Sequence, residues 1–168
     1  MEFFTPEWAS GNLDDDDSAA VVQRYNEYLG SLDKAGAVWR FATTVNLNDA
    51  YLDRVIVDKL TGNLKLSLLT GDLQVGYWMT ELTYSAAQIV DGAEILRLAL
   101  SKRPSEIWYD EFSGSPHAGS HAFLIAPRQD EGLQSWGEFR ITFDGFHFTQ
   151  KRVISRQLPT SEDQSDWG

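Results

Sequence analysis

The feature that most constrains the fold is a succession of strand-like segments, separated by turn residues, that begins near residue 51. In one of them Leu64, Leu66 and Leu68 alternate with polar residues, which is the pattern of a half-buried strand. The segments with strand character are residues 51–59, 64–70, 73–84, 106–112, 122–126, 138–143 and 146–154. Asp144-Gly145 favours a tight turn and predicts that the last two segments form a hairpin.

Helical patterns precede and interrupt this series. Thr5-Pro6 has the features of an N-cap and a first helical position. Apolar residues at spacings of three and four predict a helix over residues 15–31, and shorter stripes predict helices over 33–44 and 93–102. Helices followed by strands in hairpin succession indicate an α+β fold. We expect N-terminal helices packed on one face of a mostly antiparallel sheet of about six or seven strands.

A chain of 168 residues suits one domain, which we expect over residues 1–157, followed by an acidic C-terminal tail over 158–168. The chain has no cysteine, which excludes disulfides, thiolate metal ligands and a thiol nucleophile. It shows neither an apolar run of membrane-spanning length nor the start of a signal peptide. We therefore expect a cytoplasmic protein with no membrane partner.

Most of the net charge of −11 comes from two segments near the ends of the chain. Asp14 to Asp17 supply four negative charges, and the tail supplies three more without a basic residue. This charge repels phosphate backbones, so we expect no nucleic-acid partner, and it would steer the chain toward a basic protein. The aspartate run lacks the spaced ligands of a calcium loop and is typical of a solvated helix N-terminus.

The group that most resembles a catalytic site combines Asp110 and Glu111 with His121. Neighbouring strands would bring an acid and an imidazole together for general acid–base chemistry. Residues 110 and 111 of a strand point to opposite faces, so at most one of them faces a given pocket. A structural ion pair or a buried hydrogen bond is the more common use of such a group.

Other patterns for catalysis or cofactor binding are weak. His117 and His121 have the spacing of helical metal ligands, but Pro116 and Gly119 favour a loop there. The chain contains neither a Gly-x-Ser-x-Gly elbow nor a glycine-rich phosphate loop. We expect no metal and no cofactor.

The chain has six tryptophans, of which Trp136 and Trp167 have no obvious core to enter. Trp136 adjoins Gly137 in an expected loop, and Trp167 lies in the acidic tail. Exposed aromatic residues flanked by acids are typical of a protein-binding surface.

Short motifs spread over about 150 residues carry a resemblance to a known family. They are Met1-x-Phe3-Phe4-Thr5-x-Glu7-Trp8, Asn48-Asp49-Ala50, Gly71-Asp72-Leu73, Gly76-Tyr77 and Tyr109-Asp110-Glu111. Through them the chain resembles a family of small uncharacterised bacterial proteins, and the resemblance implies a soluble bacterial protein without an established activity. Members often have His at position 48 and an aromatic-acid-His motif where this chain has Gly119-Ser120-His121, so Asn48 and Ser120 depart from the pattern of the family.

Acidic single-domain proteins of this type are similar to immunity proteins of bacterial toxin systems. The sequence therefore predicts a protein-binding module, an immunity-type inhibitor that sequesters a basic toxin or effector domain. The expected contact residues are Asp14, Asp15, Asp16, Asp17, Trp136, Glu162, Asp163, Asp166 and Trp167. Two alternatives stay open: a small hydrolase-like or metal-dependent enzyme that uses Asp110 or Glu111 with His121, and a structural homodimer.

Overall fold

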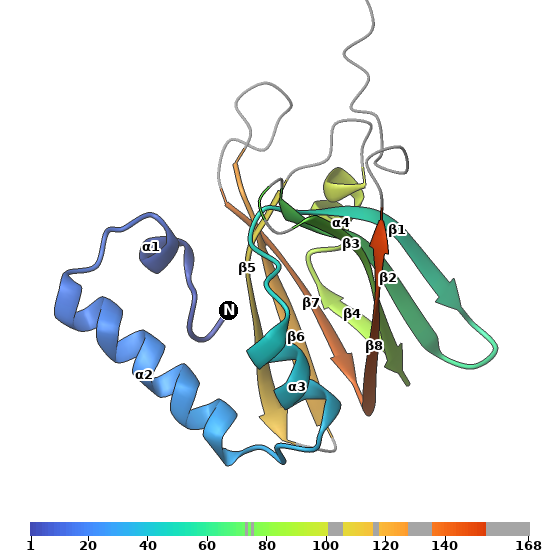
Figure 1. Ribbon diagram of the computed structural model, residues 1–168, viewed down its shortest axis with the longest axis horizontal. Helices are drawn as coiled ribbons and strands as arrows, with labels where there is room; N and C mark the ends of the chain where they lie inside the picture. Colours follow the sequence, from blue (N-terminus) through green and yellow to red (C-terminus); the bar gives the residue numbers. More distant parts are fainter. Residues whose placement is uncertain (73, 75, 101–105, 116–117, 128–135, 154–168) are drawn as a thin grey trace, which may run out of the picture.

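The computed structural model describes residues 1–153, except residues 73, 75, 101–105, 116–117 and 128–135 (Figure 1). The described helices are α1 (Pro6–Ala9), α2 (Asp15–Ser31), α3 (Ala37–Thr44) and α4 (Ala93–Ala99). The described strands are β1 (Ala50–Asp58), β2 (Asn63–Asp72), β3 (Gly76–Ser85), β4 (Gln88–Asp91), β5 (Glu106–Ser115), β6 (Ala118–Ile125), β7 (Gly137–Phe143) and β8 (Gly145–Val153).

The strands form one antiparallel sheet in the order β4-β7-β6-β5-β1-β2-β3-β8. The α+β class is therefore confirmed, with more sheet than the sequence suggested: eight strands in the described residues instead of six or seven. The additional strand, β4, has only four residues and no alternating pattern. The helix predicted over 15–31 is confirmed as α2, whereas α3 begins only at Ala37.

The hairpin predicted for residues 138–143 and 146–154 is wrong. Asp144 does connect β7 to β8, but β7 pairs with β6 and β4, while β8 pairs with β3. An Asp-Gly pair specifies where the chain turns, and the apolar side chains then decide which strands become neighbours. Here Phe143 and Phe146 contribute to the same interior, although five other strands lie between β7 and β8 in the sheet order.

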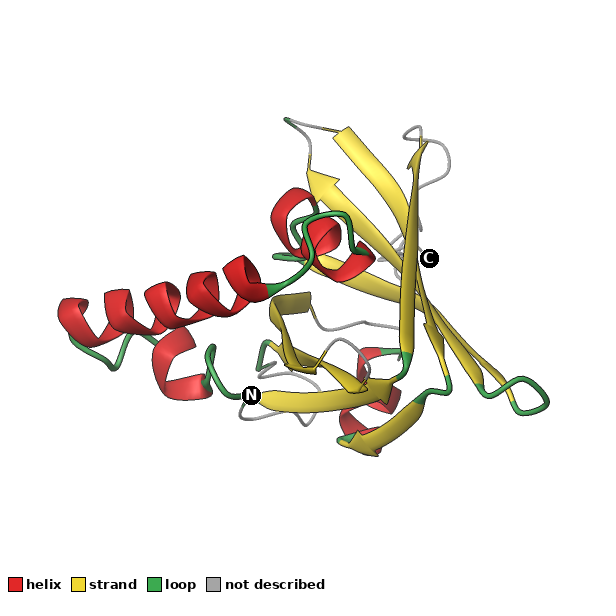
Figure 2. Ribbon diagram, turned by 90° about the horizontal axis from the view of Figure 1, so that it is seen from below, coloured by secondary structure: helices red, strands yellow, loops and turns green. Residues whose placement is uncertain are grey.

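The sheet curls around this interior because its middle is joined over a short length. β1 and β5 pair only at Ala50↔Ile107 and Tyr51↔Glu106. On one side of this junction lie β1, β2, β3 and β8, and on the other lie β5, β6, β7 and β4. The turn between β7 and β8 connects the two halves a second time, so both halves enclose one core (Figures 1 and 2).

Helix α3 closes the gap between the two halves. The ring of Phe41, which is fully buried, lies 5.8 Å from that of Phe112 on β5 and 5.4 and 5.1 Å from those of Phe146 and Phe148 on β8. Helices α1 and α2 project to one side of the sheet, and α4 packs against β7 (Figures 1 and 2). No helix in the described part of the chain is long and apolar enough to cross a membrane.

Candidate functional site

The N-terminal part of the chain forms an acidic arm, which we define as residues 1–36 and which contains α1 and α2. It holds eight acidic and two basic side chains, so it carries more than half of the net charge of −11. Asp14 is the N-cap of α2, where its Oδ1 accepts a hydrogen bond from the amide of Asp17 at 2.8 Å. This cap and the helix dipole explain why acidic residues suit this end of the helix.

The aspartates Asp14 to Asp17 are all exposed. No basic group within the described residues forms an ion pair with any of them. Four adjacent carboxylates without a cationic partner produce a concentrated negative potential at the N-terminal end of α2. A cationic molecule would reduce this repulsion by binding there.

Glu111 fixes the arm to the sheet. Its carboxylate is almost completely buried, and it accepts hydrogen bonds from the amides of Glu2, Phe3 and Phe4, the last two at 2.9 Å. The rings of Phe4 and Trp8 also pack on Tyr109, with centroids 5.9 and 4.9 Å away. The arm therefore keeps a fixed position on β5.

A second contact of the arm involves Tyr25 of α2. Its hydroxyl oxygen accepts a hydrogen bond from the Phe112 amide at 3.2 Å. Burial, together with the nearby charge of Asp110, raises the pKa of Tyr25 far above its usual value, so the phenol stays neutral. At the start of the chain the Met1 ammonium pairs with Glu138. Burial alone would raise the pKa of Glu138, but hydrogen bonds from this ammonium and from Arg140 outweigh it and lower the pKa.

The predicted acid–imidazole pair exists in the interior of the sheet. His121 Nε2 lies 2.8 Å from Asp110 Oδ2, and His121 Nδ1 lies 2.7 Å from the hydroxyl of Tyr84. Asp110 faces His121 while Glu111 faces the arm, so the expectation that they point to opposite faces is confirmed. His121 lies within β6, and its ring stacks on Phe112 with centroids 3.8 Å apart.

Burial keeps the His121 imidazole neutral. It lowers the pKa of His121, while the hydrogen bond and the charge of Asp110 oppose this shift without cancelling it. Burial also raises the pKa of Tyr84. In the arrangement that satisfies all three groups, Tyr84 donates to Nδ1 and the Nε2–H donates to the Asp110 carboxylate.

This arrangement favours a structural role for His121. A general acid or base needs a ring nitrogen within hydrogen-bond reach of its substrate. Both His121 nitrogens bind protein groups, and the side chain is 0% exposed. In the described part of the chain, no group of three or more potential metal-ligating side chains comes together, and His117 lies outside it.

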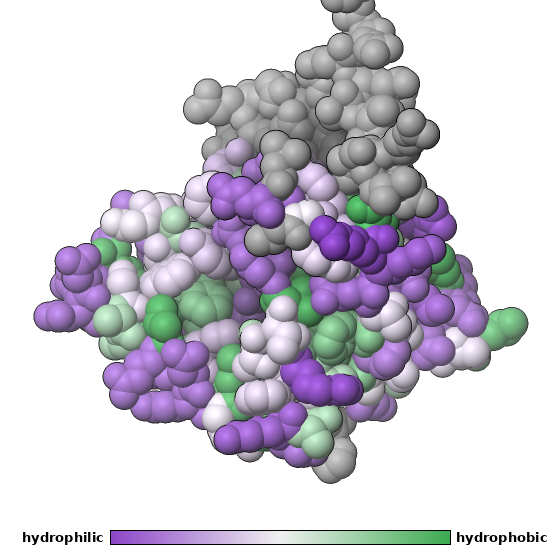
Figure 3. All heavy atoms as spheres, in the orientation of Figure 1, coloured by the Kyte–Doolittle hydropathy of each residue, from purple (hydrophilic) through white to green (hydrophobic). Residues whose placement is uncertain are grey.

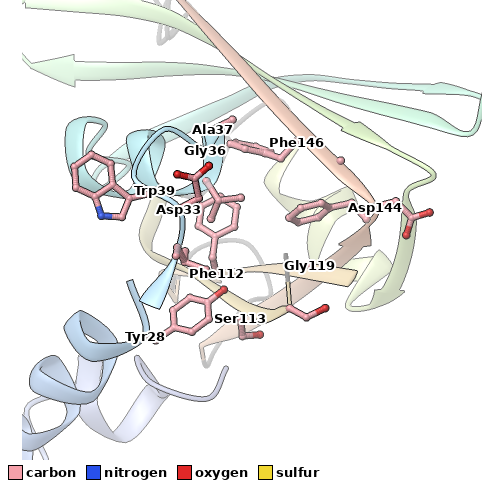
Figure 4. Close-up of a pocket in the computed structure, with 15 residues that line it drawn as sticks. Tyr28, Asp33, Gly36, Ala37, Trp39, Phe112, Ser113, Gly119, Asp144 and Phe146 are labelled. Carbon is pink, nitrogen blue, oxygen red and sulfur yellow. The ribbon is translucent and has the colours of Figure 1, made fainter. Parts of the chain in front are cut away.

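A hollow of about 240 Å³ opens beside the C-terminal end of α2 (Figure 4). Its lining comes from α2, the connection from α2 to α3, α3, β5, β6, β7, β8 and the turn between the last two strands. The residues used in the argument below are Tyr28, Asp33, Phe112, Asp144 and Phe146. The ring of Phe112 forms part of this lining and stacks on His121, so it lies between the hollow and the imidazole.

The hollow combines aromatic rings with negative charge. Asp33 and Asp144 are exposed, and the last turn of α2 contains no basic residue. The C-terminal end of a helix carries a partial negative charge, and aromatic faces attract cations. The first turn of α3, which carries the opposite partial charge, also lines the hollow, but the two carboxylates carry full negative charges, so a guanidinium or ammonium group suits the hollow better than an anion does.

The remaining predicted contact residues lie elsewhere. Trp136 is half-buried: its ring packs on Trp108 with centroids 5.1 Å apart, and its Nε1 donates to Ser10 Oγ at 2.8 Å. The sequence therefore missed a packing site for Trp136 within the domain, which leaves only part of the indole for a partner. Glu162, Asp163, Asp166 and Trp167 lie outside the described residues, as does the boundary at residue 157.

Sequence reasoning did not find the hollow or the role of Glu111. The hollow joins residues from eight segments of the chain, and no local sequence pattern predicts that these segments meet. The role of Glu111 was only weakly indicated by the sequence. A carboxylate on a strand needs hydrogen-bond donors if it is buried. No protein-family model, curated protein or solved structure matches this chain.

Proposed function

We propose that this protein is a binding module whose acidic arm takes up a basic protein, in the manner of an immunity-type inhibitor. The observation that carries the proposal is the run Asp14 to Asp17, which is exposed and without an ion-pair partner among the described residues. Complementary charge speeds the encounter of two proteins and selects between partners.

The hollow supplies the second contact. Helix α2 has 17 residues, so about 25 Å separates its acidic N-terminal end from the hollow at its other end. An interface of ordinary size, about 800 Å² on each partner, covers such a distance. We therefore place the partner along α2, with an arginine or lysine side chain between Tyr28, Asp33 and Phe146.

The first experiment measures binding of a fluorescent octa-arginine peptide by anisotropy at low and at moderate salt. The arm variant is D14N/D15N/D16N/D17N, since asparagine caps a helix about as well as aspartate. The control D53N/E81Q/D91N/E94Q removes the same charge from exposed positions outside the arm. We expect the arm variant to lose affinity by about tenfold and the control by much less. Equal losses in both variants would show that net charge alone attracts the peptide, and would refute the role of the arm.

Two further variants test the other two parts of the proposed interface, the acidic tail and the hollow. E162Q/D163N/D166N tests the acidic tail, which the sequence predicts as a second contact. Asp33→Asn tests the hollow, because it removes the carboxylate and keeps the shape of the side chain. A weaker preference for arginine over a neutral glutamine peptide in Asp33→Asn would support insertion of a cation. An unchanged preference would remove the hollow from the proposed interface.

The acid–base alternative has less support. An enzyme that uses Asp110 or Glu111 with His121 would have to expose a ring nitrogen that now binds Tyr84 or Asp110. Glu111 is engaged by three backbone amides. The binding proposal needs no such rearrangement.

A further inference from the structure

Strand β1 has an open edge over most of its length. It pairs with β2 from Tyr51 to Asp58, but β5 joins its other side only at Ala50 and Tyr51. Within the described residues, no strand pairs with this second side at residues 54–58. Among the described residues, the N–H and C=O groups of this stretch that point away from β2 have no strand partner, which is the arrangement that lets another strand pair there.

The side chains along this edge are unusually apolar for an exposed hairpin. Ile56 is 47% exposed, Val57 is 55% exposed, and Leu60 in the following turn is 99% exposed. Figure 1 shows β1 and β2 projecting from the side of the molecule opposite α2, and Figure 3 shows apolar atoms at the tip of this projection. Residues 54–58 contain no proline, which commonly protects edge strands, and their two charged side chains, Arg54 and Asp58, are exposed.

The sequence of the edge is complementary to itself. Residues 53–59 read Asp-Arg-Val-Ile-Val-Asp-Lys. When two copies align antiparallel about Ile56, Arg54 of each copy faces Asp58 of the other, and valine faces valine. Asp53 and Lys59 extend the same complementarity, although Asp53 occupies a bulge. We propose that a second copy of this chain binds here, which joins two eight-stranded sheets through their β1 edges about a two-fold axis.

Charge also selects this register. A slip of one residue in one direction places Arg54 opposite Lys59 of the other copy, and a slip in the other direction places Asp53 opposite Asp58. A parallel arrangement in register brings Arg54 beside Arg54 and Asp58 beside Asp58. Like charges directly opposite each other destabilise a strand pair, so only the arrangement centred on Ile56 satisfies every charge. It is also isologous, which is the symmetry of most dimers.

The two charged residues are available for these contacts. Arg54 is exposed and forms no ion pair within the described residues. Asp58 Oδ1 accepts hydrogen bonds from the amides of Leu60 and Thr61, at 2.9 and 3.3 Å. Hydrogen bonds from the Thr61 side chain and from these amides lower the pKa of Asp58, so its carboxylate stays ionised. The α2 arm projects from the opposite side and stays free in the dimer (Figures 1 and 2).

Sedimentation velocity of the full chain over a wide concentration range tests the proposal. We expect the wild-type chain to form a dimer that R54D and D58R each convert to a monomer. The double variant R54D/D58R restores the pairing and should be dimeric again. A mixture of the R54D and D58R chains should form a heterodimer, because each arginine at position 54 or 58 then faces an aspartate of the other chain. The control E81R reverses a charge on the exposed face of β3 and should leave the dimer intact.

Ile56→Lys provides an independent variant, since it places two ammonium groups opposite each other on the two-fold axis. It should be monomeric with an unchanged circular dichroism spectrum. A wild-type chain that stays monomeric at every concentration would overturn the proposal. A dimer that survives R54D, or a mixture of R54D and D58R that fails to associate, would also overturn it.

Discussion

Glu111 binds three consecutive backbone amides although it belongs to a strand, where side-chain carboxylates usually face solvent. The amides of Glu2, Phe3 and Phe4 all donate to its two oxygens. Hydrogen bonds to a charged acceptor contribute more than neutral ones, and a buried amide left without an acceptor costs further free energy. A single side chain thus connects the first residues of the arm to β5.

We expect Glu111→Gln to lower the free energy of unfolding by about 2–4 kcal/mol. The substitution keeps the size of the side chain but replaces one accepting oxygen with an NH₂ group that faces an amide donor. Urea unfolding followed by circular dichroism measures the change. Glu81→Gln is the matched control because Glu81 is exposed on β3, and it should change the stability by no more than about 0.5 kcal/mol. Equal stability of the two variants would contradict the role of Glu111.

For individual residues, the sequence predicted which side chains lie near each other better than it predicted what those side chains do. The alternation of a strand was sufficient to place Asp110 and Glu111 on opposite faces, and a hydrogen bond between His121 and a carboxylate was expected. Which face is interior depends on strand order, and the sequence does not contain that information locally. The partner of His121 at Nδ1, Tyr84, lies 37 residues earlier in the chain and could not be inferred from spacing.

Among the elements, α3 has the largest effect for its size. It has only eight residues, yet Phe41 contacts rings from both halves of the curled sheet. The short β1–β5 junction leaves a gap between these halves, and the Phe41 ring fills it. Removal of this ring would leave a cavity that the rigid strands on either side cannot close completely.

Phe41→Ala should therefore lower the free energy of unfolding by about 3–5 kcal/mol. Arg40→Ala, on the exposed side of the same helix, is the control for a change in helix propensity and should have little effect. Thermal and urea unfolding measure both variants. A cost below about 1 kcal/mol for Phe41→Ala would mean that α3 is not needed to hold the two halves together.

The helices and strands were largely predictable from the sequence, but the pairing of the strands in the sheet was not. Helix α2 was predicted with its full length, because an acidic first turn and apolar residues at regular spacing are local signals. The strands β7 and β8 were also found, whereas their pairing was wrong. Pairing depends on which apolar faces meet, and here Phe143 belongs to the core and Phe146 packs against it, while their strands belong to different halves.

The whole molecule places its features at separate locations: acidic charge on the arm and an open strand at the opposite side (Figure 1), with a neutral histidine in the core. Two of the effects that set its stability at low pH oppose each other. Protonation of carboxylates reduces the repulsion within a chain of net charge −11, which favours the folded state. Protonation of His121 would place a charge in the core, which favours unfolding.

The contribution of His121 has a definite sign and range of pH. Burial lowers its pKa in the folded state, opposed in part by Asp110, whereas in the unfolded chain the value is about 6.5. The unfolded chain therefore binds a proton first as the pH falls below about 6.5, and the free energy of unfolding decreases by at most about 1.4 kcal/mol per pH unit. Above this range the stabilisation by the neutral imidazole is fully present.

Urea unfolding at a series of pH values between about 7 and 5 should show this decrease in the wild-type chain and not in His121→Gln. His147→Gln, which removes an exposed imidazole from β8, is the matched control and should retain the decrease. If His121→Gln does not fold, nuclear magnetic resonance of the His121 ring in the wild-type protein gives the same information, because its signal should not titrate near pH 6.5 while the protein stays folded. A titration there, or an unchanged slope in His121→Gln, would show that the imidazole carries a proton in the folded state. The hydrogen bond from Tyr84 would then have to reverse, since a protonated Nδ1 donates and cannot accept.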